Sequence, residues 1–168
     1  VSPATVLGRI LSLDSTKSSY RLDELVDAAV GLAGHLRAGT YVAILAYATP
    51  SKPFAAAIRR LRKALVQQHQ VTTTFGYGPR YLHSTGQLHK GGPASGIFLE
   101  LVDRMTPDLT IPAQQFSFGV LAKAQATGDL ESLQAHGRPV IRVTLGADPV
   151  ATVDAIAHRV RPAPSRPH

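Results

Sequence analysis

The sequence contains no cysteine and no tryptophan, and no apolar run approaches the length of a membrane-spanning helix. Without cysteine, disulfide frameworks, thiolate zinc sites and cysteine nucleophiles are all excluded. Because a membrane helix needs about 20 apolar residues, we expect a soluble protein with no membrane partner. The lack of cysteine is compatible with a reducing compartment, so we expect a cytoplasmic location. Aromatic residues make up only 6% of the chain, which leaves few platforms for stacking nucleic-acid bases.

Carboxylates are missing from residues 41–95, although this third of the chain carries seven Lys and Arg side chains. The whole chain has 18 Lys and Arg against 11 Asp and Glu, a formal net charge of +7. Residues 41–95 therefore account for the entire excess. A basic, acid-free stretch suits an anionic partner, either a phosphorylated small molecule or nucleic acid.

The chain has 168 residues, of which 44% are hydrophobic and 17% charged. This composition indicates one folded domain with a buried core rather than a disordered chain. The chain begins with Val and shows no signal peptide, and we expect it to be a piece of a longer protein. We interpret residues 1–19 as a linker or N-terminal extension, residues 20–160 as the domain, and residues 161–168 as a disordered tail.

Helical and strand-like segments alternate along the domain. Hydrophobic residues at helical spacing predict helices over residues 20–36, 54–68, 120–135 and 149–160, the third with a break at Thr127-Gly128. Short apolar or β-branched runs predict strands over residues 41–48, 71–75, 96–102 and 139–145. Runs without polar alternation are typical of strands covered on both faces. The pattern predicts an α/β three-layer sandwich around a mostly parallel sheet.

Residues 76–96 carry the densest group of reactive side chains, and we expect them to form a long glycine-rich loop. A loop of about 20 residues within a compact domain suggests a function. Glycine lets the backbone approach a ligand, and the hydroxyls, amide, imidazoles and cations of this segment suit a polyhydroxylated anion such as a sugar phosphate. Ligands of α/β sheets gather beyond the carboxyl ends of strands, where this segment begins. The alternative is a structural loop with surface histidines.

The run GPRYLHSTGQLHKGGPASGIFLEL at residues 78–101 resembles a signature of bifunctional transaldolase/glucose-6-phosphate isomerases. The flanking runs YVAILAYATP and QQFSFGVLAKAQATGDLESLQAHGRPVIRV are similar to that family too, so the resemblance covers about residues 37–146. It implies a sugar-isomerase (SIS) domain, which is flavodoxin-like. It also implies conversion of glucose 6-phosphate to fructose 6-phosphate without metal or redox cofactor. The implied partners are a hexose 6-phosphate and upstream isomerase and transaldolase domains of the same chain.

Aldose–ketose isomerisation needs one group that opens the sugar ring and a base that moves a proton between C1 and C2. The resemblance assigns His89, the second histidine of the motif, to ring opening or protonation of the ring oxygen. The alternative for His89 is an imidazole that stabilises the loop. His83 is the other candidate, on a stretch that we expect to be extended, and a structural role explains it equally well.

Five further side chains of the motif are candidates for substrate binding. Ser84, Thr85 and Gln87 are hydrogen-bond partners for sugar hydroxyls or phosphate, with ordinary turn chemistry as the alternative. Arg80 and Lys90 are cations that can neutralise phosphate or an enediolate, or can pair with acids of a neighbouring domain. Two histidines without a third ligand do not make a metal site, so we expect no metal.

The segment offers no carboxylate to act as the base. Glu100 lies in the following strand prediction, where we expect a residue at the edge of the core or on the surface. The resemblance places the catalytic Glu upstream of this chain, so we expect the isolated domain to be inactive.

Two other functions stay open. One is a non-catalytic sugar-phosphate-binding module, and the other, less favoured, is a basic nucleic-acid-binding domain. The second would use the charge cluster of the helix predicted over residues 54–68, which we interpret as a solvated helix face. That cluster comprises Arg59, Arg60, Arg62 and Lys63.

Overall fold

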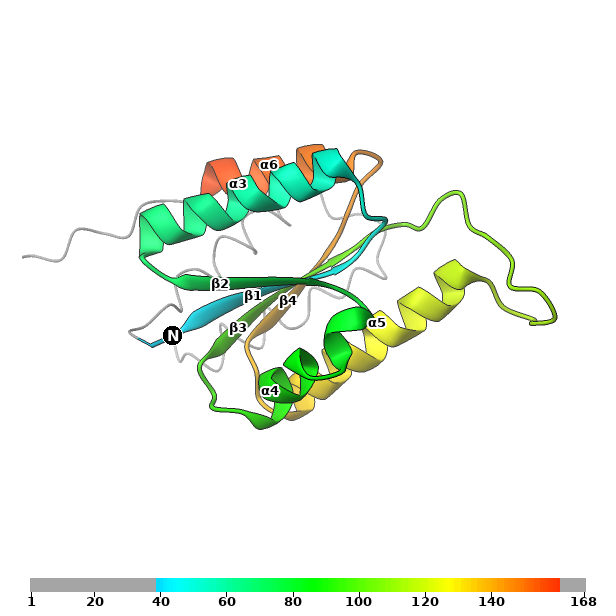
Figure 1. Ribbon diagram of the computed structural model, residues 1–168, viewed down its shortest axis with the longest axis horizontal. Helices are drawn as coiled ribbons and strands as arrows, with labels where there is room; N and C mark the ends of the chain where they lie inside the picture. Colours follow the sequence, from blue (N-terminus) through cyan, green and yellow to red (C-terminus); the bar gives the residue numbers. More distant parts are fainter. Residues whose placement is uncertain (1–38, 161–168) are drawn as a thin grey trace, which may run out of the picture.

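The computed structural model describes residues 39–160 (Figure 1). The linker 1–19, the helix expected over 20–36 and the tail 161–168 lie outside the described residues. The described elements follow one another in the order β1 (Tyr41–Tyr47), α3 (Lys52–His69), β2 (Thr72–Tyr77), the 3-10 helix η1 (Arg80–Leu82), α4 (Thr85–Gly91), β3 (Gly96–Val102), α5 (Phe118–Ala135), β4 (Val140–Thr144) and α6 (Pro149–Arg159).

The four strands form one parallel sheet in the order β2-β1-β3-β4. Helices α3 and α6 cover one face, and η1, α4 and α5 cover the other (Figure 1). This arrangement confirms the predicted α/β three-layer sandwich, which is flavodoxin-like. Strand β3 is buried along its whole length and β1 nearly so, because both are central strands covered on two faces.

Successive side chains on each strand point to opposite faces of the sheet. Each face has its own hydrophobic core. On β3, Leu99 and Leu101 face α3 and α6, whereas Phe98 and Val102 face α4 and α5. Glu100 lies between Phe98 and Val102 on the second face. The alternation therefore carries a carboxylate into the core beneath α4 and α5.

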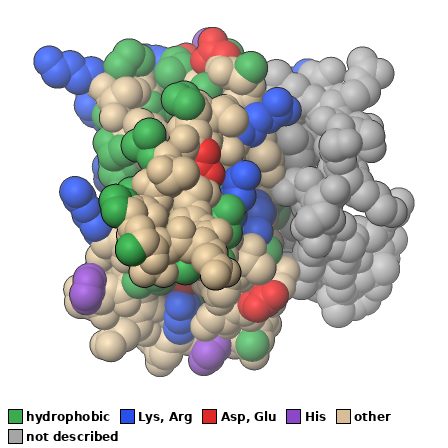
Figure 2. Space-filling view, turned by 90° about the vertical axis from the view of Figure 1, so that its right-hand side faces the viewer, with side chains coloured by type: hydrophobic (Ala, Val, Ile, Leu, Met, Phe, Trp, Pro, Cys, Tyr) green, Lys and Arg blue, Asp and Glu red, His purple; other side chains and the backbone are tan. Residues whose placement is uncertain are grey.

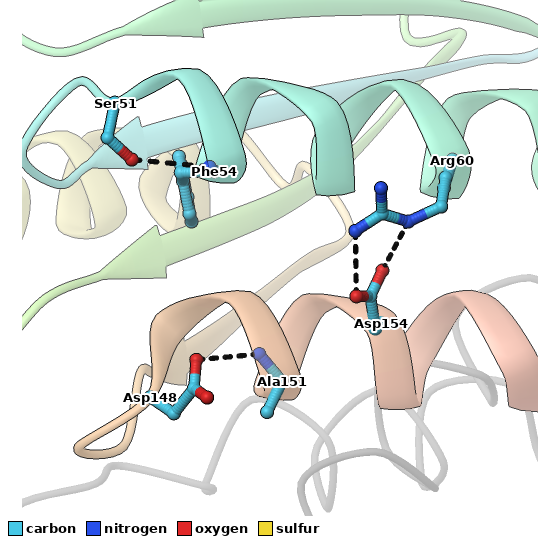
Figure 3. A network of polar contacts seen from close by, with 6 residues as sticks. All are labelled: Ser51, Phe54, Arg60, Asp148, Ala151 and Asp154. Carbon is cyan, nitrogen blue, oxygen red and sulfur yellow. Dashed lines mark hydrogen bonds and ion pairs between the residues drawn. The ribbon is translucent and has the colours of Figure 1, made fainter.

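Helix α3 begins at Lys52, two residues before the predicted start, because Ser51 caps it. The Ser51 hydroxyl accepts a hydrogen bond from the Phe54 amide at 3.2 Å, and Asp148 caps α6 in the same way at Ala151 (Figure 3). The apolar face of α3 is buried as its spacing predicts. A bidentate ion pair between Arg60 and Asp154, with both N–O distances at 2.8 Å, joins α3 to α6 (Figure 3).

The basic cluster of α3 is largely a solvated face. Arg59 and Lys63 are exposed, and Arg62 donates to the Thr73 hydroxyl and carbonyl at 3.0 and 3.1 Å. With Arg60 bound to Asp154, two of the four cations already serve contacts within the domain.

The prediction of a long irregular loop over residues 76–96 is wrong. Strand β2 continues to Tyr77, and η1 and α4 follow it. His83 has φ −64° and ψ −73°, so the expectation of an extended conformation there is also wrong. The glycine count suggested a loop, but side chains from distant elements hold this segment in helical turns, as described below.

Helix α5 runs without interruption from Phe118 to Ala135, so the predicted break at Thr127-Gly128 is wrong. Gly128 is exposed and has helical neighbours on both sides. A glycine in a helix costs only about 1 kcal/mol relative to alanine. The burial of Ala126 and Leu133 on the inner face of α5 offsets that cost.

The chain between β3 and α5 projects beyond the carboxyl edge of the sheet (Figure 1). A bridge between Thr110 and Ser117 closes this excursion. Figure 2 looks onto the same edge, where hydrophobic side chains lie exposed among polar ones. The exposed large hydrophobic side chains of the excursion and of the first residues of α5 are Leu109, Phe116, Phe118, Val120 and Leu121. Within residues 39–160, no helix is long and apolar enough to cross a membrane.

Candidate functional site

The candidate site is the segment 80–90, which follows the carboxyl end of β2. The Gly78 amide donates to the Ala46 carbonyl at 2.9 Å, which holds the start of the segment against β1. A Cβ at Gly78 would lie 2.5 Å from the Tyr47 ring. Only glycine fits this close approach, so the segment turns inward directly after the strand.

The segment has an exposed polar face and a buried face. Tyr81, Gly86 and His89 are buried, whereas the exposed face gathers most of the predicted site residues. These are Arg80, His83, Ser84, Thr85 and Gln87. The structure therefore brings five of the seven predicted residues to solvent on one short stretch. The other two, His89 and Lys90, make contacts inside the domain.

His89 is only 3% exposed. Its Nδ1 lies 2.9 Å from the Tyr41 hydroxyl, and its ring meets the Phe98 ring edge-on with centroids 5.0 Å apart. Burial lowers the pKa of His89, and this effect outweighs the nearby Asp129 carboxylate, which acts in the opposite direction. Its environment therefore favours the neutral imidazole and holds it away from solvent.

Lys90 pairs with a carboxylate of its own domain. Its Nζ lies 2.7 Å from Oδ1 of Asp129, and the other oxygen of Asp129 accepts a hydrogen bond from the Tyr81 hydroxyl at 2.5 Å. The side chain of Asp129 is 2% exposed and that of Lys90 is 25% exposed. The contact thus runs from the surface into the core.

Arg138 holds the carboxyl end of α4. Its Nη2 donates to the backbone carbonyls of Lys90 and Gly92 at 2.8 and 2.5 Å. The last carbonyls of a helix have no partner within the helix, and a cation there also complements the helix dipole. Arg138 is 6% exposed, so this clamp is buried.

Glu100 lies beneath the segment and is 0% exposed, so the expectation of a residue at the core edge or surface is wrong. It sits opposite Arg142 on β4, whose Nε lies 2.5 Å from Oε2. Among the described residues, no group hydrogen-bonds Oε1. Burial raises the pKa of Glu100 to about 7, although Arg142 opposes the shift.

Sequence reasoning missed the residues that hold the segment: Asp129, Arg138 and Tyr41. Each lies more than 30 residues from its partner in sequence, and no local motif links them. One available signal is that Asp129 falls on the apolar face of α5, in line with Ala126 and Leu133. Within residues 39–160, no group of three His, Asp or Glu side chains could hold a metal ion.

No family model and no curated protein matches this sequence. The structure is similar to the solved structure of a hypothetical protein from Thermus thermophilus, with a TM-score of 0.66 and 18% sequence identity. The superposition covers 92% of this chain and 42% of that chain, so this chain spans less than half of that protein. At this identity the similarity shows the shared α/β fold alone.

Proposed function

We propose that this domain supplies the hexose 6-phosphate-binding surface of an aldose–ketose isomerase that interconverts glucose 6-phosphate and fructose 6-phosphate. The observation that carries the proposal is the exposed face of the segment 80–87. It presents a guanidinium, an imidazole, two hydroxyls and an amide on the segment that directly follows the carboxyl end of β2. The phosphate and hydroxyl groups of the sugar match these donors and acceptors. The motif at residues 78–101 supports the same assignment.

The exposed residues of the segment are the ones that can contact the sugar. Arg80 is placed to bind the phosphate or to stabilise the charge of an enediolate. Of the two imidazoles, His83 is exposed and His89 is buried. We therefore assign donation of a proton to the ring oxygen to His83 and the support of α4 to His89.

The proposal places the base that moves a proton between C1 and C2 upstream of this domain, as the motif at residues 78–101 implies. Glu100 is 0% exposed and the Asp129 side chain 2% exposed, so neither carboxylate reaches a sugar carbon. The proposal therefore includes upstream isomerase and transaldolase domains in the same chain, in a cytoplasmic enzyme.

The burial of His89 favours a second candidate, a sugar-phosphate-binding module without catalysis. Such a module needs the exposed face of the segment but no acid–base pair. A longer chain that restores the upstream part should turn over hexose 6-phosphate under the first function and should not under the second. Both require this domain to bind hexose 6-phosphate.

An NMR titration of the 168-residue chain with glucose 6-phosphate tests the proposal. We expect saturable shifts of the backbone amides of residues 80–87, and much weaker shifts with glucose. Arg80→Gln should raise the Kd by about tenfold, because a charge-assisted hydrogen bond is worth about 1.5–3 kcal/mol. Arg59→Gln, which removes an exposed arginine from α3, is the matched control and should leave the Kd unchanged. Absence of saturable binding would refute both candidate functions.

A further inference from the structure

A single buried carboxylate holds both ends of the segment 80–90. Asp129, on α5, contacts Lys90 on α4 at 2.7 Å and the Tyr81 hydroxyl of η1 at 2.5 Å. No other side chain in the described residues is shown bonding to both of these elements. Asp129 therefore joins η1 and α4, which carry the exposed face, to α5.

The surroundings make this contact strong. Asp129 is almost out of reach of water, so its charge must be neutralised by partners rather than by solvent. Lys90 is the cation that does so, and its ammonium has three donors. Its nitrogen lies 2.7 Å from Oδ1 of Asp129 as an ion pair. Because the Lys90 side chain is 25% exposed, the remaining donors can meet an anion at the surface.

Three further contacts from other elements hold helix α4. Arg138 binds its last carbonyls, Tyr41 binds His89, and Phe98 packs against the His89 ring. These contacts hold α4 near its carboxyl end. Among the side chains of other elements described here, Asp129 alone bonds to both α4 and η1, on either side of His83 and Ser84.

We propose that Asp129 is a positioning residue that fixes Lys90 and the exposed face of the segment 80–90 for a phosphorylated sugar. Lys90 shares its ammonium between the buried carboxylate and the phosphate of the ligand. The identity of the ligand rests on the proposed function, whereas the positioning of the segment does not.

Asp129→Asn is the sharpest variant for the test. The amide keeps an oxygen that accepts from Tyr81, but it removes the charge that holds Lys90. In the 168-residue chain, hydrogen exchange of the α4 amides should accelerate by about tenfold or more, with β1 and β3 unchanged. Glu131→Gln is the matched control, because it removes an exposed carboxylate from the same helix. Unchanged exchange in Asp129→Asn would overturn the proposal.

Two variants of Lys90 keep the test decisive if Asp129→Asn does not fold. Lys90→Gln changes a partly exposed side chain and should reproduce the faster exchange, whereas Lys90→Arg should restore protection because it keeps the cation. The ammonium of Lys90 gives a spectroscopic signature as well. In the native chain, the ammonium protons should exchange with water slowly enough to give an NMR resonance. In Asp129→Asn that resonance should be lost. Equal signals in both chains would contradict an ionic tether.

Titration with glucose 6-phosphate then separates this inference from the proposed function. If both are correct, Asp129→Asn raises the Kd by about tenfold and Glu131→Gln does not. If the native chain binds no hexose phosphate, the proposed function and the ligand part of the inference fail together, while faster α4 exchange still supports the positioning. If the native chain binds and Asp129→Asn binds equally well, the inference fails and the proposed function stands.

Discussion

His83 and His89 are carried by the same short segment, yet they lie in different environments. His83 is exposed, whereas His89 is enclosed by Tyr41 and Phe98. A buried imidazole contributes packing and a hydrogen bond, and its removal leaves the Tyr41 hydroxyl without that partner. The two residues therefore differ in what their loss should cost.

His89→Ala should lower the free energy of unfolding by about 2–3 kcal/mol, because it creates a cavity and breaks a buried hydrogen bond. His83→Ala should change it by less than about 0.5 kcal/mol and should weaken binding of glucose 6-phosphate. Urea unfolding and NMR titration measure the two effects. A stable His89→Ala that loses binding would reverse the assignment of the two imidazoles.

Glu100 should make the stability of the protein depend on pH. Its pKa lies at about 7 in the folded chain, above the ordinary value of 4.5, because burial disfavours the charged carboxylate. Between these two values the folded state binds more protons than the unfolded state, so the free energy of unfolding falls as pH rises from about 4.5 to 7. The lowered pKa of His89 acts in the opposite direction, because protonation of a buried imidazole destabilises the fold at low pH.

Comparison of the native chain with Glu100→Gln isolates the carboxyl group, since His89 is present in both. Between pH 5 and pH 8, Glu100→Gln should gain stability relative to the native chain by about 2 kcal/mol or more, from 1.36 kcal/mol for each unit of pKa change. Urea unfolding at several pH values measures this difference. Glu131→Gln, an exposed carboxyl, should show almost none. A pH-independent difference for Glu100→Gln would contradict the raised pKa.

At the scale of secondary structure, the glycines of α5 allow a paired test of helix propensity and packing. A Cβ at Gly128 would meet no atom within 4 Å, whereas a Cβ at Gly119 would lie 2.5 Å from the Asp108 carboxylate. Gly128→Ala should therefore raise the free energy of unfolding by about 0.5–1 kcal/mol, because alanine is the better helix former. Gly119→Ala should lower it, since Asp108 accepts from the Gly119 amide at 2.7 Å. Thermal unfolding measures both, and a destabilised Gly128→Ala would contradict a continuous helix.

The regular elements could be predicted from local patterns because each one carries its own signal. The buried face of α3 follows from apolar spacing, and β1 and β3 follow from uninterrupted apolar runs. Helix α4 has no such signal, because its seven residues include two glycines. Its order comes from tertiary contacts. Asp129 and Arg138 lie 39 and 48 residues from Lys90 in the chain, and nothing local in the sequence shows that they meet it.

At the scale of the whole molecule, two of the seven cations in the acid-free third of the chain pair with acids from other segments. Lys90 meets Asp129, and Arg60 meets Asp154. The sequence shows the imbalance along the chain but not the pairings in space. At the candidate site, the cations that can meet a ligand are Arg80 on the exposed face and the partly exposed ammonium of Lys90. This is a smaller and more local positive charge than the net value suggests, and it suits one phosphate better than a polyanion.

Because the proposed function places the catalytic base upstream, the 168-residue chain alone should not isomerise sugar phosphates. A coupled assay for fructose 6-phosphate conversion should read background, because Glu100 and Asp129 are both buried beneath the segment. An added active isomerase serves as the control that the coupling enzymes work. Robust turnover would mean that a carboxylate of this chain reaches the sugar. Asp103, half-buried directly after β3 and held by its amide to the Tyr47 carbonyl at 2.8 Å, would then be the first residue to replace. Loss of that turnover in Asp103→Asn would locate the base at the carboxyl edge of the sheet.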